Sequence, residues 1–340
     1  MRTRILIASC LLLASCVSPN LVEHGPRTFA PRLAENHARM PDGYRLPLYR
    51  WTASTIDNDV QQFVILGLHG FNDYSNAFAP LAQSLAEAGI TTYAVDQRGF
   101  GATALAGRWH GSEQLTADLV ELTSLLRQRY KEARLYLIGE SMGAAVAIDA
   151  LGRSELPVDG AVLIAPAVWS RDAMPWFQRL GLDSLAHIAP GMQLTGKGIR
   201  IRPSDNIDML RAMGADPLVI KATRVDALWG VTNVMDRAME ALSKLHGPLL
   251  LLYGERDEII PRHAFCRMLR RLPQDNHSIR LVLYREGWHM LPRDLQGQRV
   301  QADIIAWLHN SQGRLPSGEE SPPDAARTQH FCEQPSITAG

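Results

Sequence analysis

The sequence lacks an excess of either charge, and it lacks the motifs that usually hold metals or phosphates. Among its 340 residues, 35 Lys and Arg balance 35 Asp and Glu. This balance gives no indication of a nucleic-acid partner or of a polybasic membrane-binding surface. There is no glycine-rich phosphate loop and no cluster of Cys and His at metal-ligand spacing, so the sequence predicts neither a metal site nor a cofactor.

The N-terminus has only a short apolar run. Residues 5–13 follow Arg2 and Arg4 and are mostly apolar, but they are too few to span a bilayer as a mature helix. The sequence from Leu13 to Cys16 resembles the lipobox of bacterial lipoproteins, in which the cysteine is lipidated and becomes the new N-terminus. Residues 1–15 are therefore predicted to be a lipoprotein signal peptide, with a plain secretory signal as the alternative. By the same resemblance, Val17 favours anchoring in the outer membrane of a bacterial envelope, facing the periplasm.

Cysteine is scarce, with four in the chain. Cys10 leaves with the predicted signal, and Cys16 is the predicted lipidation site. Cys266 and Cys332 would then lie in a compartment that permits disulfides. Either they pair and pin the C-terminal tail to the domain, or they remain free thiols, and the sequence leaves both alternatives open.

Buried strands and helices alternate over most of the chain, which favours an α/β fold with a mostly parallel central sheet and helices on both faces. The core is predicted to comprise residues 43–170 and 246–310, preceded by a polar, proline-containing tether over residues 16–42. Expected strands cover 44–52, 63–68, 91–95, 135–138, 161–164, 248–253 and 279–284, and expected helices cover 80–88, 115–130, 262–272 and 298–309.

Between residues 171 and 245 the alternation stops, and helical patches dominate. One helical face carries apolar residues that are either additional core or the underside of an inserted helical cap over the active site, and the cap is the favoured interpretation. Trp169, Trp229 and Met235 are the predicted substrate-pocket residues. Residues 311–340 are rich in Gly, Pro, Ser, Glu and Gln and predict a flexible tail unless Cys332 holds it.

The segment Gly139-Glu140-Ser141-Met142-Gly143 follows an apolar run and precedes a run of small residues. This is the G-x-S-x-G pattern of a nucleophile elbow, in which a sharp strand-to-helix turn exposes a serine hydroxyl. A serine nucleophile needs a base, and the base needs an orienting acid. Asp257 and His289 each follow a later predicted strand, so the order Ser141, Asp257, His289 predicts a catalytic triad. The alternatives, Glu255 and Glu258 as the acid and His263 and His277 as the base, are less well placed.

A tetrahedral intermediate needs hydrogen-bond donors for its oxyanion. The backbone N–H of Met142, directly after the nucleophile, is one predicted donor. The other is the backbone N–H of Phe71, in the loop after the strand at residues 63–68. His69, in the same loop, is expected to hold the loop rather than to act as the base.

These segments together resemble the α/β-hydrolase superfamily, and more closely its monoacylglycerol lipase and lysophospholipase branch, often grouped with serine aminopeptidases. The resemblance spans residues 44–309. The segment Asp96–Gly101 resembles a structural turn of that family, with Arg98 expected to be anchored by carboxylates. Two features differ from members with monoglyceride activity, namely Glu140 where histidine often precedes the nucleophile and a glycine-poor loop after Gly70.

The resemblance implies a serine hydrolase that cleaves small-molecule carboxylic esters through an acyl-serine intermediate, without a cofactor. An apolar cap suggests acyl lipids such as a monoacylglycerol or a lysophospholipid. The same triad could serve a peptidase or amidase, or an acyltransferase. A non-catalytic envelope binding protein on a hydrolase scaffold is the alternative from another class.

Overall fold

A computed structural model describes residues 19, 21–53, 62–196, 198, 200–273, 276–322 and 324–334. The predicted signal peptide, with Cys10, and the predicted lipidation site Cys16 lie outside the described residues. Within the described ranges, none of the helices combines the length and the apolar character that a membrane crossing requires.

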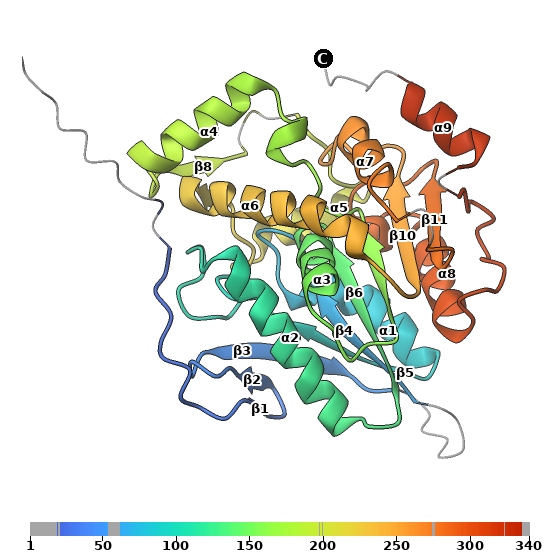
Figure 1. Cartoon of the computed structure of the whole chain (residues 1–340), viewed down its shortest axis with the longest axis horizontal. Helices are drawn as coiled ribbons and strands as arrows, with labels where there is room; N and C mark the ends of the chain where they lie inside the picture. The colour runs from blue at the N-terminus through green and yellow to red at the C-terminus, as the bar shows by residue number, and fades with distance from the viewer. Residues whose placement is uncertain are drawn as a thin grey trace, which may run out of the picture.

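A nine-stranded sheet forms the centre of the molecule (Figure 1). Its spatial order is β1-β2-β3-β5-β4-β6-β7-β10-β11. The strands from β5 to β11 pair in parallel, whereas β1, β2 and β3 pair antiparallel at one edge. The predicted, mostly parallel sheet is therefore confirmed. The strands are β1 (Arg32–Leu33), β2 (His37–Arg39), β3 (Arg45–Trp51), β4 (Phe63–Leu68), β5 (Ile90–Val95), β6 (Arg134–Glu140), β7 (Gly160–Ile164), β10 (Leu249–Gly254) and β11 (Ile279–Tyr284).

Helices cover both faces of this sheet (Figure 1). On one face, α2, α3 and α6 share a large apolar cluster with the strands, and on the other, α1 and α8 share a second cluster. Two buried layers explain why the central strands are apolar on both faces. The helices are α1 (Ala79–Glu87), α2 (Ser112–Arg129), α3 (Met142–Arg153), α4 (Trp176–Ile188), α5 (Ile207–Ala215), α6 (Val225–Ala241), α7 (Arg262–Leu269), α8 (Gly297–His309) and α9 (Ala326–Glu333), with short 3-10 turns η1 (Ser75–Phe78), η2 (Arg171–Ala173), η3 (Leu242–Lys244) and η4 (Leu291–Arg293).

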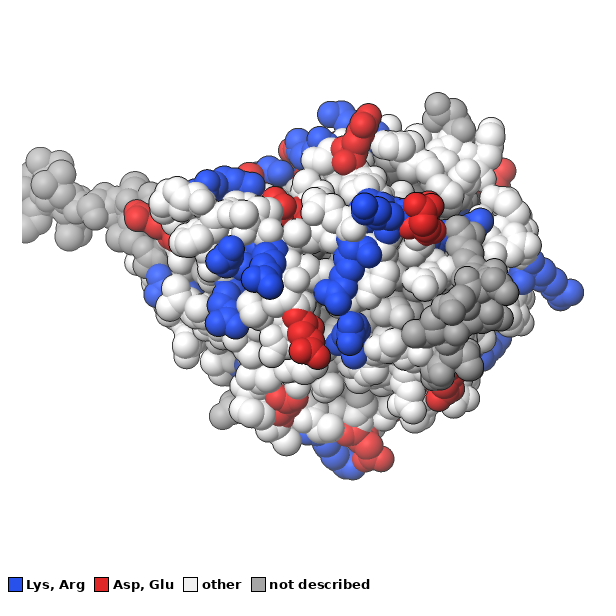
Figure 2. All heavy atoms as spheres, turned by 90° about the horizontal axis from the view of Figure 1, so that it is seen from below, with Lys and Arg blue, Asp and Glu red and all other residues white. Residues whose placement is uncertain are grey.

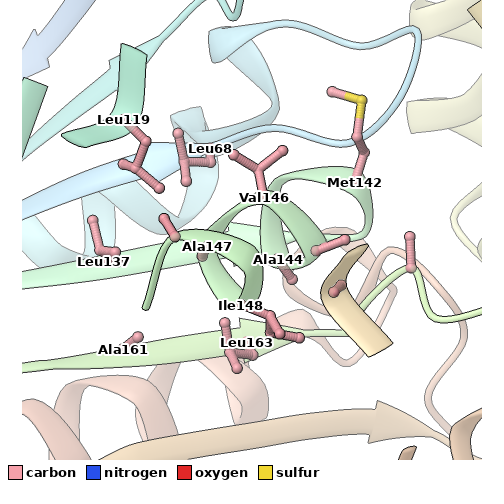
Figure 3. Close-up of a cluster of buried hydrophobic side chains, with 14 of the residues drawn as sticks. Leu68, Leu119, Leu137, Met142, Ala144, Val146, Ala147, Ile148, Ala161 and Leu163 are labelled. Carbon is pink, nitrogen blue, oxygen red and sulfur yellow. The ribbon is translucent and has the colours of Figure 1, made fainter. Parts of the chain in front are cut away.

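Helix α3 is the most deeply buried helix of the site region (Figure 3). Its small side chains allow a close approach to the sheet, where Leu68, Leu137 and Leu163 of three neighbouring strands pack against it. Val146 and Ile148 are fully buried in this layer. The start of α3, which follows Ser141, is therefore fixed firmly relative to the strand ends.

The predicted cap, residues 171–245, requires correction where it includes α6. The apolar face of α6, including Val231, Val234 and Ala238, belongs to the large core cluster. Gly152 of α3 allows this contact, because a Cβ there would lie 2.5 Å from the carbonyl oxygen of Ala241. Helix α6 is therefore part of the core. The stretch before it contains α4, α5 and a two-stranded antiparallel sheet of β8 (Gln193–Thr195) and β9 (Ala222–Arg224), and most of its described residues lie outside the two core clusters.

The predicted tether reaches too far into the domain. Residues 32–33 and 37–39 form β1 and β2, which extend the sheet. Ala38 and Met40 are fully buried. The polar composition of this segment concealed these few inward-pointing side chains, because a short edge strand buries only alternate residues.

The C-terminal tail was predicted to be flexible unless Cys332 holds it, and the structure has this exception. Residues 326–333 form α9, and Cys332 on this helix is bonded to Cys266 on α7, with an S–S distance of 2.01 Å. Of the two alternatives for these cysteines, the structure has the pair. Phe331 is 3% exposed, so α9 also buries apolar surface against the domain.

Positive charge accumulates locally despite the balanced composition. On the face that Figure 2 shows, basic and acidic side chains are interspersed, and several basic side chains gather near the middle. The register of the edge strands sets Arg32 opposite Arg39, and Arg39 opposite Arg45. Slight burial and these three arginines lower the pKa of His37. Sequence totals cannot show such an accumulation, because it depends on strand pairing.

Candidate active site

Ser141 occupies a sharp turn between β6 and α3. Its backbone has φ 53° and ψ −114°, a conformation that non-glycine residues rarely adopt and that a nucleophile elbow requires. The turn is held from both sides, because Ser141 N–H donates to Ile164 O at 2.9 Å and Ser141 O accepts from Ala167 N–H at 3.0 Å. The strained serine is therefore fixed by the neighbouring strand β7.

The two glycines that flank the elbow are required by close packing. A Cβ on Gly143 would lie 2.0 Å from the carbonyl oxygen of Leu68, and one on Gly139 would lie 2.6 Å from the Cα of Ala144. Any larger residue would push α3 away from β4 or β6. The G-x-S-x-G spacing thus reflects the contact of one helix start with two strands.

Asp257 and His289 meet beside this end of the sheet. Strands β10 and β11 are parallel neighbours with Gly254 in register with Tyr284, so the loops that follow them leave the same edge. His289 Nδ1 donates to Asp257 Oδ2 at 2.8 Å. Asp257 Oδ1 accepts from the backbone N–H groups of Ile259 and Ile260, at 2.7 and 3.0 Å. The carboxylate is fixed on both oxygens, and Nε2 is the ring nitrogen left for proton transfer.

The electrostatic surroundings favour a protonated His289. Burial by itself would lower the pKa of the imidazole, but the charge and hydrogen bond of Asp257, together with the charge of Glu140, raise this pKa above its ordinary value. Arg293 acts in the opposite direction. An imidazole stabilised as imidazolium by a buried carboxylate is what a general base needs after it has taken a proton.

Two backbone N–H groups near Ser141 have no acceptor. Among the described residues, neither the N–H of Phe71 nor that of Met142 donates a hydrogen bond to the protein. The loop that carries Phe71 lies against the elbow, since a Cβ on Gly70 would be 3.4 Å from the Cβ of Ser141. These two groups are available as the donors that an oxyanion requires.

His69 holds this loop, as the sequence predicted. Its Nδ1 donates to Gly70 O at 2.8 Å, and its Nε2 accepts from Gln97 N–H at 3.0 Å. Both ring nitrogens are occupied, and complete burial lowers the pKa of the imidazole. His69 is therefore a neutral structural histidine and is not available as a base.

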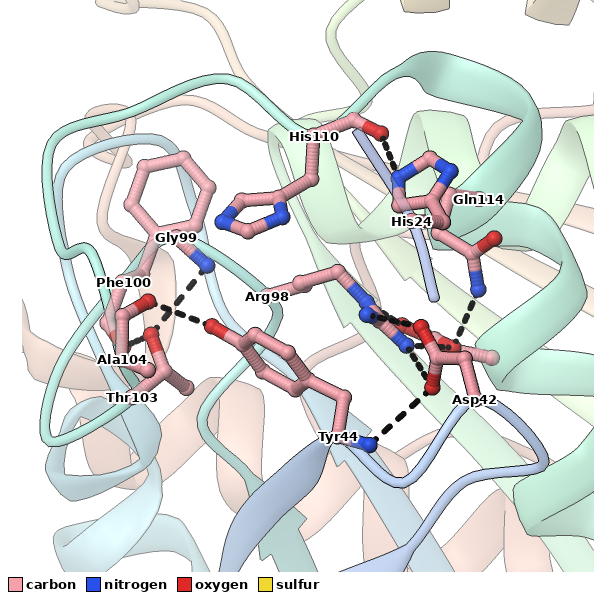
Figure 4. Close-up of polar contacts among 11 residues, drawn as sticks. His24, Asp42, Tyr44, Arg98, Gly99, Phe100, Thr103, Ala104, His110 and Gln114 are labelled. Atoms are coloured by element: carbon pink, nitrogen blue, oxygen red, sulfur yellow. Dashed lines mark hydrogen bonds and ion pairs between the residues drawn. The ribbon is translucent and has the colours of Figure 1, made fainter. Parts of the chain in front are cut away.

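Arg98 is anchored by carboxylates, again as predicted (Figure 4). Its guanidinium lies 2.7 Å from Asp42 and 2.7 Å from Asp118, and its Cζ is 4.0 Å from the centre of the Tyr44 ring. Figure 4 shows the side chains of Asp42 and Tyr44 beside that of Arg98. The arginine ties the N-terminal segment and α2 to the turn at residues 96–101, which confirms a structural role.

A second buried arginine, Arg293, contacts the residue before Ser141, and the sequence patterns did not predict it. Arg293 donates to Glu140 Oε1 at 2.9 Å and to Asp73 Oδ2 at 2.8 Å. All three side chains are at most 7% exposed. The signal in the sequence was Glu140 itself, because a buried carboxylate at a strand end needs a cation, but the sequence did not reveal that Arg293 supplies it.

Comparison with known proteins fits this geometry. Residues 60–296 match the family described as Serine aminopeptidase, S33. The chain belongs to this family. Over 282 residues it is 24% identical to the Monoacylglycerol lipase of Mycolicibacterium smegmatis, covering 78% of this chain and 93% of that protein. Over 269 residues it is 27% identical to the human Monoglyceride lipase, covering 75% of this chain and 84% of that one.

Solved structures show the same fold. The Paleococcus ferrophilus monoacylglycerol lipase superposes with a TM-score of 0.63 at 24% identity, covering 77% of this chain and 98% of that one. A soluble variant of the Saccharomyces cerevisiae monoglyceride lipase, solved with a substrate analog, superposes with a TM-score of 0.68 at 18% identity. The superposition covers 87% of this chain and 99% of that one. The predicted α/β-hydrolase fold is therefore confirmed for this S33-family member.

In this S33-family member, the segment that runs from β8 through β9 contacts both the loop that carries His289 and the loop that carries Phe71. Pro203 O accepts from the backbone N–H groups of His289 and Met290, both at 3.1 Å. On the other side, Asn72 Nδ2 donates to Thr223 Oγ1 at 2.6 Å, and Tyr74 Oη donates to Asp216 Oδ2 at 2.7 Å. The segment thereby links the loop that carries His289 with the loop that carries Phe71.

Asp294 is hydrogen-bonded to the loop that carries His289. It accepts from Ser204 Oγ at 2.6 Å and from Trp288 N–H at 2.8 Å. Burial raises its pKa to about 6, although both hydrogen bonds oppose the shift. No local sequence pattern indicates this carboxyl group, because its side-chain partner Ser204 lies far away in the chain.

The predicted pocket residues occupy different environments. Trp229 on α6 packs its ring 6.2 Å from that of His187 and 5.4 Å from Arg171. Met235, also on α6, packs against the large core cluster. Trp169 is half-buried after β7, and its indole N–H has no acceptor among the described residues. A role in substrate binding stays a prediction for all three.

Proposed function

We propose that this protein is a serine hydrolase that cleaves carboxylic esters of acyl lipids, such as monoacylglycerols or lysophospholipids, through an acyl-serine intermediate. The observation that carries the proposal is the hydrogen bond of 2.8 Å between His289 and Asp257, in loops that leave the same edge of the parallel sheet as the elbow serine Ser141. The names of the relatives support the substrate class, because several are monoacylglycerol or monoglyceride lipases.

In this mechanism, Ser141 Oγ attacks the ester carbonyl carbon while His289 Nε2 takes the hydroxyl proton. The N–H groups of Phe71 and Met142 stabilise the oxyanion of the tetrahedral intermediate. Its collapse breaks the ester C–O bond, and His289 returns the proton to the leaving alcohol. A water molecule, deprotonated by His289, then releases the fatty acid and restores Ser141.

An exposed apolar surface on α4 supports a lipid substrate. Trp176 is 72% exposed, Phe177 58%, Leu180 59% and Ile188 76%, all on one helix at the top of Figure 1. Exposed apolar patches of this kind are typical of surfaces that contact other apolar groups. Together with lipidation at Cys16, which we also propose, this favours an enzyme that works at the membrane of a bacterial envelope.

The test combines a substrate panel with a covalent probe. The purified protein is expected to hydrolyse p-nitrophenyl esters, monoacylglycerols and lysophospholipids faster than peptide anilides, and to be labelled by a fluorophosphonate. Ser141→Ala should abolish both reactions, and Asp257→Asn should lower kcat about 10⁴-fold. Ser124→Ala, which removes a hydroxyl on α2 bonded to Val120 O, is the matched control. Faster cleavage of the anilides would favour a peptidase, and an unlabelled wild-type protein would refute the proposal.

A further inference from the structure

The C-terminal segment beyond the family match contacts the loop that carries Asp257. The match ends at residue 296, whereas residues 319–322 cross the edge strand β11 and residues 324–333 end in α9, next to α7 (Figure 1). Leu283 N–H donates to Glu319 O at 3.3 Å, and Ser321 N–H donates to Leu281 O at 2.9 Å. We call residues 319–322 and 324–333 the C-terminal clamp. Its first part therefore covers the open edge of the sheet.

The second part of the clamp contacts the start of the acid loop, which we define as residues 255–260. Arg327 Nη2 donates to Glu255 Oε1 at 2.7 Å and to Leu283 O at 2.6 Å. Its Nη1 donates to Glu319 O at 3.2 Å. One guanidinium thus connects α9, strand β11 and the residue that begins the acid loop.

The end of the acid loop is held by an aromatic stack. Phe331 on α9 lies edge-on to Tyr253, with 5.9 Å between the ring centres, and Tyr253 stacks on Phe265 at 3.9 Å. Tyr253 Oη donates to Ile260 O at 2.7 Å. The disulfide between Cys332 and Cys266 fixes α9 against α7, which follows the loop directly.

Covering a sheet edge would need only the first part of the clamp. The remaining contacts concentrate on a loop with exposed residues at Arg256 and Glu258, whereas the Asp257 side chain inside it is 0% exposed. A catalytic group has to stay within about 0.5 Å of its working position, and a displacement of about 1 Å can cost about 100-fold in rate.

We propose that the C-terminal clamp is a positioning element for the catalytic acid, with Arg327 and Glu255 as the pair that holds Asp257 against His289. This inference rests on the proposed serine hydrolase function. Arg327 touches neither Asp257 nor His289 in the described structure, so it acts through Glu255 and the acid loop.

The test compares Arg327→Gln with Arg127→Gln in the purified full-length protein. The two arginines are matched, because each is 28% exposed, forms one short ion pair and donates to backbone carbonyls. Arg127 makes these contacts with Asp159, Pro157 and Ala133, away from the acid loop, whereas Arg327 also lies 3.8 Å from a second carboxylate, Glu319. The first readout is the pKa of the His289 imidazole, followed by NMR with labelled histidine. The second is kcat and KM for a p-nitrophenyl ester, and thermal stability is recorded for each variant.

Arg327→Gln is expected to lower the pKa of His289 by about 0.5, because Asp257 raises it, and to lower kcat about tenfold with KM unchanged. The other charged groups facing His289 are Glu140 and Arg293, and neither contacts the clamp within the described residues. Glu255→Gln should lower the His289 pKa and kcat to the same extent as Arg327→Gln, and Arg327→Lys should lower them less. The double variant Arg327→Gln with Glu255→Gln should differ little from either single variant. Arg127→Gln should leave both readouts at wild-type values.

A wild-type His289 pKa in Arg327→Gln and in Glu255→Gln would overturn the proposal, even if thermal stability fell. If Arg327→Gln does not fold, Glu255→Gln decides, because it leaves the clamp intact. The NMR titration does not need turnover. An inactive wild-type protein would therefore refute the hydrolase function, while the His289 titration would still decide whether the clamp positions the acid loop.

Discussion

Arg293 and Glu140 form a buried ion pair of 2.9 Å, one residue away from the elbow serine. Asp73, two residues after Phe71, is the third member of this buried charged group and lies 2.8 Å from the guanidinium of Arg293. The group of three therefore joins the strand that ends before Ser141, the loop near Phe71 and the segment after His289. It also accounts for a glutamate at position 140, because Arg293 compensates its charge.

We expect Arg293→Met to destabilise the protein by about 3–5 kcal/mol, because it leaves two buried carboxylates without a cation. Urea unfolding measures this loss. Esterase activity per folded molecule should fall as well, since Glu140 adjoins Ser141.

Arg98→Met is the matched control, because Arg98 is equally buried between two carboxylates, Asp42 and Asp118. We expect a similar loss of stability with activity per folded molecule retained. Wild-type stability in Arg293→Met would show that the buried pair contributes nothing.

Asp294 is expected to make stability fall as the pH rises from about 4 to about 6. Its pKa in the folded protein is about 6, above the value of about 3.9 for an unfolded aspartate, so the folded state binds the extra proton in this window. Asp294→Asn should remove this dependence and add up to about 3 kcal/mol at pH 7. Urea unfolding between pH 4 and pH 7 measures it. Asp205→Asn should weaken the dependence without removing it, because burial is the largest cause of the raised pKa of Asp294 and the charge of Asp205 is a smaller one.

Reduction of the disulfide, or Cys332→Ser, should lower the free energy of unfolding by about 4 kcal/mol, because the bond closes a loop between residues 66 apart in sequence. Thermal unfolding with and without reductant measures the difference for the wild type. Cys332→Ser itself should show no further response to reductant. Two titratable thiols in the native, oxidised protein would contradict the pairing.

Cys16→Ser should release the protein from membranes. If Cys16 carries acyl chains, each buried methylene contributes about 0.8 kcal/mol to membrane binding, and two or more chains anchor stably. Fractionation of cells expressing wild-type or variant protein, followed by a high-salt wash, tests this. Retention of Cys16→Ser in the washed membrane fraction would argue against a lipid anchor at this position.

The strands and the turn at Ser141 were predictable because the sequence patterns that indicate them are local. Residues 63–68 and 279–284 have the predicted bounds, since runs of apolar residues between polar loops identify strands buried on both faces. The elbow was recognisable because its glycines are needed for contacts within a few residues of Ser141 or with the adjacent strand. His69 and Arg98 were also interpreted correctly, from their places in loops after strands.

The boundaries of the cap, tether and tail were not predictable in the same way. Helix α6 has the same apolar periodicity whether it covers a pocket or packs on α3. Residues 32–39 and 326–333 are polar in composition, and only their few buried side chains, such as Ala38 and Phe331, reveal that they belong to the fold.

By itself, the sequence determined the α/β arrangement, the elbow at Ser141 and the order of the three candidate catalytic residues, because hydrophobic periodicity and turn residues act over short distances. Tertiary structure alone decided which distant groups meet. It paired Arg293 with Glu140, Cys332 with Cys266, and Arg327 with Glu255. The physical reason is that an ion pair or a disulfide depends on separation in space, and separations across 66 to 153 residues are set by how the sheet and helices pack.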